Sequence, residues 1–153
     1  MPESQRGLAL LPVRIFVGWV FLRASLVKLT GGWLAGHKLG PIIEGWLADG
    51  RPYGFYAPFL RNVVLPSEHT FGALVTCGEL VVGATLLAGL FTRVGALVGV
   101  ALATSFLLGR GDGAEANATA PFIAMTLTLL MGHSGRALGL DAALADRVPP
   151  WLT

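Results

Sequence analysis

The sequence predicts an all-α integral membrane protein: a four-helix bundle with an aromatic-rich interfacial segment between its first two spans. Two observations carry this prediction. Hydrophobic residues make up 54% of the 153 residues and charged residues only 13%, whereas a typical soluble domain carries about 25% charged residues. The apolar residues are also gathered into four stretches, as expected of helices that cross a bilayer with about 20 residues each. A disordered chain is excluded, because its apolar content would be far lower.

The four predicted spans occupy most of the chain, which we treat as a single membrane domain over residues 1–153. The first two are long enough to cross. The third is short by a few residues, so it either crosses with its polar ends drawn in or includes Thr92 and Arg93. The fourth is long enough only if it begins before Pro121, which would then kink it. Arg14 interrupts the first apolar run, so we interpret that run as a retained span and not a cleaved signal peptide. The spans are predicted at about residues 7–29, 71–91, 93–109 and 113–133.

The orientation in the membrane is constrained by the number of spans and by the basic residues. Four spans place both termini on the same side. Lysine and arginine residues are divided almost evenly between the two sides, so the positive-inside rule favours cytoplasmic termini by a small margin.

Residues 30–70, between the first and second spans, form neither a simple hydrophilic loop nor a further span. They hold six of the fourteen aromatic residues, interleaved with four prolines. Within the run PIIEGWLADG, Ile42 and Trp46 fall on one helical face and Glu44 on the other. We therefore expect an interfacial segment, either a cap on the bilayer surface or a lid over a lipid-side opening between the spans.

Composition and motif spacing exclude several classes of function. A net charge of +2 with scattered basic residues offers no nucleic-acid-binding surface. The single cysteine, Cys77, excludes an internal disulfide, a CxxC redox pair and a cysteine-based metal site. The three histidines lie far apart, and the glycine-rich run 109–113 follows an apolar helix instead of the strand that a dinucleotide fingerprint requires. We therefore expect no metal and no self-contained catalytic motif.

Four ionisable residues fall inside the predicted spans: Arg14, Arg23, Lys28 and Glu79. Each costs about 2.5–3.5 kcal/mol at mid-membrane on insertion scales, so such residues usually pair or line a polar cavity. At about 100° per residue, Arg14 and Lys28 lie on one helical stripe, whereas Arg23 points away from it. The other members of this stripe are Gly18, Phe21 and Ser25.

Two criteria disagree about the basic partner of Glu79. Counting about 1.5 Å per residue from the outer side, Arg23 lies about 9 Å deep and Glu79 about 12 Å deep, which favours an Arg23–Glu79 pair. The helical stripe instead favours Lys28 reaching inward. The pair is either an architectural ion pair that fixes the register of two helices, or part of a polar pocket for a headgroup, a quinone or a proton. Asn117, at the outer end of the predicted bundle, is a further candidate for hydrogen bonding near Glu79.

Small residues predict how the spans pack, because they let helix backbones approach closely in lipid. Cys77, beside the ridge of the second span, is expected to be a small buried side chain. The predicted ridges are Gly72, Thr76, Glu79 and Gly83 in the second span, Gly95, Gly99 and Ala103 in the third, and Ala120, Ala124 and Thr128 in the fourth.

Several short motifs follow one another in a fixed order along the chain. They are Arg14-(x)3-Gly18-(x)2-Phe21 with Lys28-Leu29, Gly78-Glu79-Leu80 with Gly83, Gly89-Leu90-Phe91-Thr92-Arg93, Gly132 through Gly135, and Leu138-Gly139-Leu140-Asp141. Their order and spacing, with the short turn after the second span, resemble the DoxX family (DoxX/DoxD-like) over about residues 10–145. Arg23 and the long aromatic segment depart from the family's pattern.

The resemblance implies a four-helix bundle in the inner (plasma) membrane of a bacterium or archaeon, associated with redox chemistry near the quinone pool. Members include the small subunit of a thiosulfate:quinone oxidoreductase and partners of oxidative-stress enzymes. The sequence shows no electron carrier of its own, so we expect dependence on partner proteins, with quinone as the candidate ligand and Glu79 with Lys28 or Arg23 as the residues that hold it. The alternatives are a non-catalytic assembly or scaffold subunit and a small transporter, for which four spans without inverted halves leave little room.

Overall fold

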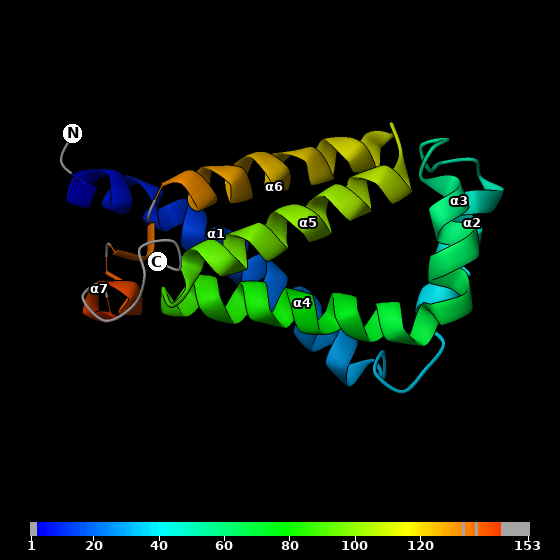
Figure 1. Ribbon diagram of the computed structural model, residues 1–153, viewed down its shortest axis with the longest axis horizontal. Helices are drawn as coiled ribbons and strands as arrows, with labels where there is room; N and C mark the ends of the chain where they lie inside the picture. Colours follow the sequence, from blue (N-terminus) through cyan, green and yellow to red (C-terminus); the bar gives the residue numbers. More distant parts are fainter. Residues whose placement is uncertain (1–2, 133, 137, 145–153) are drawn as a thin grey trace.

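Four long helices form the body of the protein, so the predicted all-α fold is confirmed. The computed structural model describes residues 3–132, 134–136 and 138–144, and the regular structure within these ranges is helical. The long helices extend along the longest axis of the molecule (Figure 1). They are α1 (Glu3–Thr30), α4 (Glu68–Ala88), α5 (Thr92–Arg110) and α6 (Ala114–Met131).

The lengths of these helices suit a membrane protein. The stretches long and apolar enough to cross a bilayer are Gly7–Thr30, Ala57–Ala88 and Thr92–Arg110. α6 has a shorter apolar part, but its full 18 residues extend over about 27 Å at 1.5 Å per residue. α5 includes Thr92 and α6 begins before Pro121, so both extensions predicted for the third and fourth spans are confirmed.

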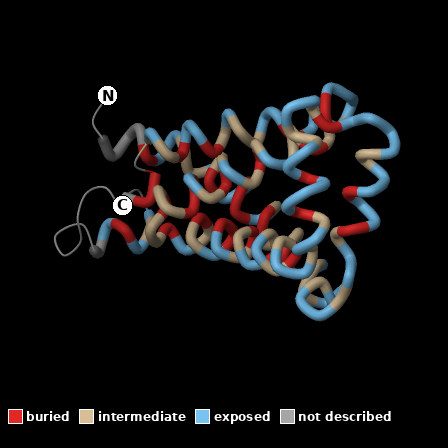
Figure 2. Tube along the Cα trace, turned by 45° about the vertical axis from the view of Figure 1, so that its right-hand side comes forward, coloured by how far each residue is buried: buried red, intermediate tan, exposed pale blue. Residues whose placement is uncertain are grey.

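The helices pack in chain order, which leaves one side of the bundle open. α1 packs against α4, α4 against α5, and α5 against α6, whereas α1 and α6 make a much smaller contact. They lie close together at the end of the bundle where α1 begins, and they diverge towards the other end (Figure 1). Buried positions recur along each long helix (Figure 2). The buried side chains of the core are Val17, Phe21, Val82, Leu86, Ala96 and Leu129.

Glycines on α4 and α5 allow the closest helix contacts. A Cβ atom added at Gly83 would lie 2.6 Å from the backbone nitrogen of Leu22 on α1. A Cβ atom added at Gly99 would lie 2.9 Å from the methyl carbon of Thr126 on α6. The small-residue ridges predicted for the second and third spans are therefore confirmed as packing faces.

Two other predictions about small residues are wrong. The structure exposes the predicted ridge of the fourth span: Ala120, Ala124 and Thr128. Cys77 is likewise exposed on α4. α6 buries the stripe that contains Thr119 and Thr126 instead. Because this helix is apolar around most of its circumference, residue size alone does not identify the face that turns inward.

The aromatic-rich segment covers one end of the bundle, and we call residues 31–67 the cap. It contains α2 (Leu39–Ala48) and α3 (Ala57–Phe59), which lie across the helix ends (Figure 1). Beneath it, Ile43, Leu60 and Val64 form a small apolar core of their own.

The predicted boundary between this segment and the second span needs a correction. A π-helical turn (Leu60–Val64) and a 3-10 turn (Leu65–Ser67) continue from α3 into α4, so the helical stretch begins at Ala57 and not near residue 71. Pro58 lies in the first turn of α3, where its missing N–H costs no hydrogen bond, and Pro66 lies in the 3-10 turn that joins the π-helical turn to α4.

The described C-terminal residues fold back at the opposite end of the bundle. The turn η3 (Ser134–Arg136) and the short helix α7 (Leu140–Leu144) lie near the beginning of α1 (Figure 1). The first and last described helices therefore meet at one end, as an even number of crossings requires.

Candidate functional site

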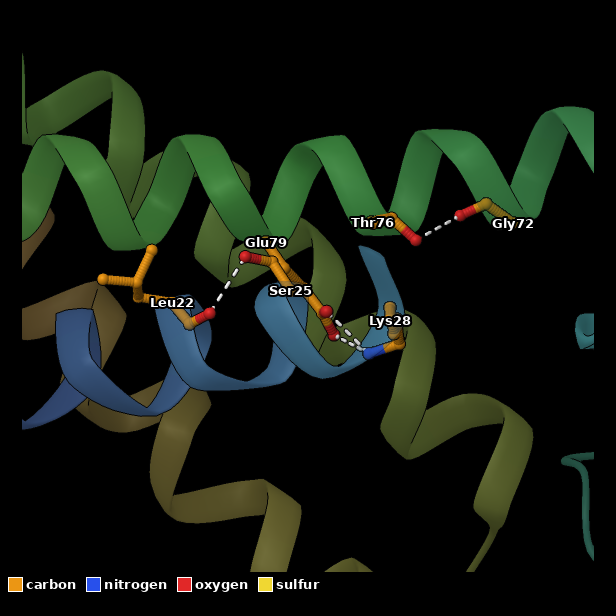
Figure 3. A network of polar contacts seen from close by, with 6 residues as sticks. All are labelled: Leu22, Ser25, Lys28, Gly72, Thr76 and Glu79. Carbon is orange, nitrogen blue, oxygen red and sulfur yellow. Dashed lines mark hydrogen bonds and ion pairs between the residues drawn. The ribbon is translucent and has the colours of Figure 1, made fainter. Parts of the chain in front are cut away.

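A buried ion pair joins the first two spans near the cap. The Nζ atom of Lys28 lies 2.6 Å from Oε1 and 2.6 Å from Oε2 of Glu79, whose side chain is 3% exposed. Figure 3 shows Lys28 reaching from α1 to the carboxylate on α4. The nearby hydroxyls of Ser25 and Thr76 donate to backbone carbonyls of their own helices. Neither hydroxyl therefore competes with Lys28 for the carboxylate.

The depth estimate that favoured Arg23 as the partner of Glu79 is wrong. Arg23 lies on the exposed face of α1, whereas the predicted stripe that ends at Lys28 faces the bundle. The depth estimate counts rise along parallel helices, but α1 crosses α4 obliquely (Figure 1). The long lysine side chain also bridges an axial offset. The stripe is the better guide, because it depends only on the local geometry of one helix.

The ion pair borders a cavity of about 340 Å³ that is lined by residues of α1, α4, α5, α6 and the cap. Its walls are mainly apolar, and its polar side chains are those of Lys28, Glu79, Arg110 and Thr119. An apolar cavity with a few placed polar groups is typical of small-molecule sites. The apolar lining residues are Val20, Phe21, Ala24, Trp33, Leu39, Ile42, Trp46, Val75, Ala103, Phe106, Ala118 and Phe122.

Aromatic rings hold both cations of the cavity in cation–π contacts. The Lys28 Nζ atom lies 5.3 Å from the ring centroid of Trp33. The guanidinium carbon of Arg110 lies 5.8 Å from the ring centroid of Trp46 and 5.7 Å from that of Phe106. Two of these rings come from the cap, which therefore covers the end of the cavity that faces the membrane surface. The segment thus forms a cap across this end of the bundle (Figure 1), and its alternative role as a lid over a lipid-side opening between the spans stays a prediction.

Sequence reasoning missed Arg110 and the two tryptophans as cavity residues. Arg110 ends α5, one residue beyond the predicted third span and within the glycine-rich run 109–113. The structure lays α2 against this helix end so closely that a Cβ atom added at Gly109 would lie 2.8 Å from the Trp46 ring. That contact joins residues more than sixty positions apart, and no local pattern in the sequence signals it.

The structure does not place Asn117 in the cavity that Glu79 lines. Asn117 is exposed on α6 and does not line the cavity, to which this helix contributes Thr119 as its polar side chain. Asn117 and Thr119 are two positions apart on α6, which corresponds to about 200° of rotation. Their side chains therefore point in nearly opposite directions. The site candidate on α6 is therefore corrected from Asn117 to Thr119.

Arg14 belongs to a separate cluster at the opposite end of the bundle. Its guanidinium donates hydrogen bonds to the carbonyl oxygen of Ser134 at 2.6 Å and to that of Leu138 at 3.3 Å. The side chain is 2% exposed. Arg14 therefore fastens the C-terminal segment to α1 and takes no part in the cavity.

Asp141 completes this cluster, which we call the C-terminal latch (Arg14, Thr92 and Asp141). Its carboxylate accepts hydrogen bonds from the backbone nitrogen of Phe91 at 2.6 Å and from the backbone nitrogen and hydroxyl of Thr92 at 3.1 Å and 2.7 Å. These contacts satisfy the free N–H groups at the start of α5. The latch thus joins α7 to the turn between α4 and α5.

A second, polar pocket of about 680 Å³ lies between the cap and the turn that joins α5 to α6. Arg110 lines both this pocket and the apolar cavity. Tyr53 donates a hydrogen bond to Asp112 there, and the bond to the carboxylate raises the pKa of Tyr53 above its ordinary value of 10.0. Arg110 therefore stands between the apolar cavity and the polar surface.

The family model for DoxX matches residues 9–110. The chain belongs to the DoxX family. Together with the long apolar helices, this assignment makes it an integral membrane protein. The matched range includes Lys28, Glu79 and Arg110, whereas the C-terminal motifs that also resemble the family lie beyond it. No solved structure matches the chain.

The cavity of this DoxX protein offers hydrogen-bond donors and a single excess positive charge on an apolar background. Within the described ranges, no three His, Cys, Asp or Glu side chains lie together so that they could hold a metal ion. The cavity instead presents one ammonium, one guanidinium and one carboxylate. The N–H groups of Lys28 and Arg110 can donate hydrogen bonds to acceptor atoms of a bound molecule.

Proposed function

We propose that this DoxX protein is a small four-span membrane subunit that binds a quinone in the cavity and takes part in membrane redox chemistry with a partner protein. The observation that carries the proposal is the Lys28–Glu79 pair at the wall of a mainly apolar cavity within the membrane-spanning bundle. A charged pair inside lipid is costly, and such pairs often mark a ligand or proton site.

The residues present fit a quinone ring. Lys28 and Arg110 supply N–H donors for its two carbonyl oxygens, and the rings of Trp33, Trp46 and Phe106 supply flat faces against which it can stack. The cavity volume of about 340 Å³ lies at the small end of the range of roughly 300–1,000 Å³ for small-molecule sites. This size suits a ring with the first part of a tail.

The reduction of a bound quinone takes up two electrons and two protons. In the proposed arrangement Lys28 donates a hydrogen bond to one carbonyl oxygen, and Glu79 beside it takes up and passes on protons. Arg110 lines both the cavity and the polar pocket, from which the protons are proposed to enter. The electrons are proposed to come from a partner protein, because the sequence has one cysteine and no metal-ligand motif.

A scaffold or assembly subunit is the second candidate, and one observation favours it. Both carboxylate oxygens of Glu79 already bind Lys28, so the pair is satisfied without a ligand and ties α1 to α4. The sole role of an ion pair of this kind can be to fix the register of two packed helices. The aromatic cap would then be the surface that contacts the partner.

Purification in a mild detergent separates the two candidates. The quinone proposal predicts that an organic extract of the pure protein contains quinone in stoichiometric amount, and that Lys28→Met removes it. Arg23→Gln, on the exposed face of the same helix, is the matched control and should retain the quinone. A larger complex that carries no quinone would instead establish the scaffold.

We also propose that the protein lies in the inner (plasma) membrane of a bacterium or archaeon with both termini in the cytoplasm. The lysine and arginine residues are divided almost evenly between the two sides, so the positive-inside rule favours this orientation by a small margin. A reporter enzyme fused after Thr153, active only outside the cytoplasm, should be inactive. An active reporter would reverse the orientation.

A further inference from the structure

The cavity has one side that the helices leave open. α1 and α6 diverge towards the cap (Figure 1), and the cavity lies between them, with Ala24 of α1 and Ala118 of α6 in its lining. Ala118 is exposed and Ala24 is half-buried. The lining therefore reaches the molecular surface where α1 and α6 separate.

The remaining sides are closed by packing. Between α1 and α4, and between α5 and α6, glycines bring the neighbouring helix within contact distance. Towards the far end of the bundle, Phe122 fills the gap between α1 and α6. Its ring centroid lies 6.1 Å from that of Phe16 in a stacked arrangement and 6.2 Å from that of Phe21 edge to face. The opening is thus confined to the half of the α1–α6 gap nearest the cap.

We propose that the cavity opens sideways into the bilayer between α1 and α6, and that its ligand has a single long apolar tail that leaves between Ala24 and Ala118. The inference rests on the proposed function for the identity of the ring. It adds the substrate class and its source: a lipid-soluble ring with one alkyl or isoprenoid tail, taken from the bilayer and not from water.

The lining explains why such a molecule is preferred. Towards the opening the wall residues are apolar: Val20, Ala24, Ala118 and Phe122. A strongly hydrated ligand would lose its water there without gaining hydrogen bonds, whereas an alkyl chain exchanges lipid contacts for equivalent protein contacts. Leu39 and Trp46 of α2 cover the end that faces the membrane surface. The ring is therefore held near Lys28 while the tail remains in lipid.

A substitution in the opening tests the route of the tail. Ala118→Phe fills the opening, and Ala124→Phe adds the same ring to an exposed position of α6 outside the cavity lining, as the matched control. Binding in lipid nanodiscs is measured by quenching of tryptophan fluorescence with a dimethoxybenzoquinone that carries a decyl chain, and with the same ring without the chain. We expect Ala118→Phe to weaken binding of the decyl compound about tenfold, to leave the ring compound unchanged, and Ala124→Phe to affect neither.

Two results would overturn the lateral route. Unchanged binding of both compounds to Ala118→Phe would show that the tail does not pass this residue. Equal weakening of both would show that the residue contacts the ring and not the tail. If neither compound binds to the wild-type protein, the proposed function fails, and the opening is tested without a quinone.

A spin label provides that independent test. A nitroxide is attached to the cysteine of Ala24→Cys in a Cys77→Ala background, and its collisions with oxygen, which concentrates in lipid, are compared with those of a water-soluble nickel chelate. We expect the label at residue 24 to be as accessible to oxygen as a label placed at Leu26, which is 48% exposed on the same helix. Low accessibility to both reagents, as for a label at the fully buried Ala96, would refute the opening. So would a preference for the nickel chelate.

Discussion

Glu79 and Lys28 show how the surroundings of one side chain decide whether a charge can remain inside a membrane bundle. The acid is 2% exposed, and the ammonium group lies 2.6 Å from both of its oxygens. A buried pair of this kind contributes little net stability, but the loss of one partner leaves an uncompensated charge in a low-dielectric environment. Single and double substitutions should therefore behave very differently.

Lys28→Met alone should lower the free energy of unfolding by about 3 kcal/mol, because it leaves Glu79 without its counter-ion. The double variant Lys28→Met/Glu79→Leu should recover most of this loss. Arg23→Met, on the exposed face of α1, is the control and should change stability little. Thermal unfolding in detergent measures all three. A double variant as unstable as Lys28→Met would show that the pair is not the source of the effect.

Tyr53 gives a prediction about pH at the cap. Its hydrogen bond to Asp112 favours the neutral phenol, so its pKa lies above the ordinary value of 10.0. The contribution to stability is therefore present below about pH 10 and is lost as the pH rises through the raised pKa. Titration of tyrosine absorbance should show one late transition, absent in Tyr53→Phe and shifted to lower pH in Asp112→Asn. An unshifted transition in Asp112→Asn would contradict the contact.

At the residue scale, the sequence predicted the pair but left its basic member open. The helical stripe identifies Lys28, because rotation along one helix is a local property. The depth of Arg23 relative to Glu79 depends on how two helices cross, and that angle is set by side chains packed along the whole contact. The stripe was therefore right where the depth estimate was wrong.

At the scale of the helices, glycine decides how closely α1 and α4 approach. Gly83→Ala should lower the free energy of unfolding by about 1–3 kcal/mol, since the new methyl group would meet the backbone of Leu22 at 2.6 Å. Gly45→Ala is the control, because no atom lies within 4 Å of a Cβ atom added there, and alanine favours the α2 helix. Urea or thermal unfolding measures both. Equal stability of the two variants would refute the close approach.

The C-terminal latch is a second contact between elements. Asp141→Ala should cost about 1–2 kcal/mol, because the carboxylate caps the start of α5 and binds Thr92. Asp49→Ala, at a side chain that is 54% exposed and paired only at the surface, should cost much less. Unfolding of both variants under identical conditions is the test. Equal losses would show that the latch adds nothing to the fold.

The extents of the helices were more predictable than their faces. Hydropathy and length placed all four long helices, and the borrowed Thr92 and the early start of α6 followed from the length that a bilayer demands. The inward face of α6 was not predictable from the stripe of Ala120 and Ala124, because a helix in lipid is apolar on both its inner and outer faces. The same limit applies to Cys77, which is exposed.

At the scale of the whole molecule, the proposed function depends on an incomplete bundle. Because α1 and α6 diverge (Figure 1), a cavity remains between them, and the cap covers its end. The sequence predicted an interfacial segment with two alternative roles, but the contact of Trp46 with Arg110 joins parts of the chain that no local pattern relates. The cavity is thus a product of tertiary structure, although Lys28 and Glu79 were recognisable beforehand.

The most direct test of the central claim is a titration of the purified protein in lipid nanodiscs with the decyl-substituted quinone, followed by tryptophan fluorescence. Lys28→Met/Glu79→Leu is compared with wild-type protein, because it should fold while lacking two of the three charged groups of the cavity. The account predicts saturable binding to the wild-type protein and about tenfold weaker binding to the double variant. Identical binding curves for the two proteins, or no saturable binding to either, would contradict it.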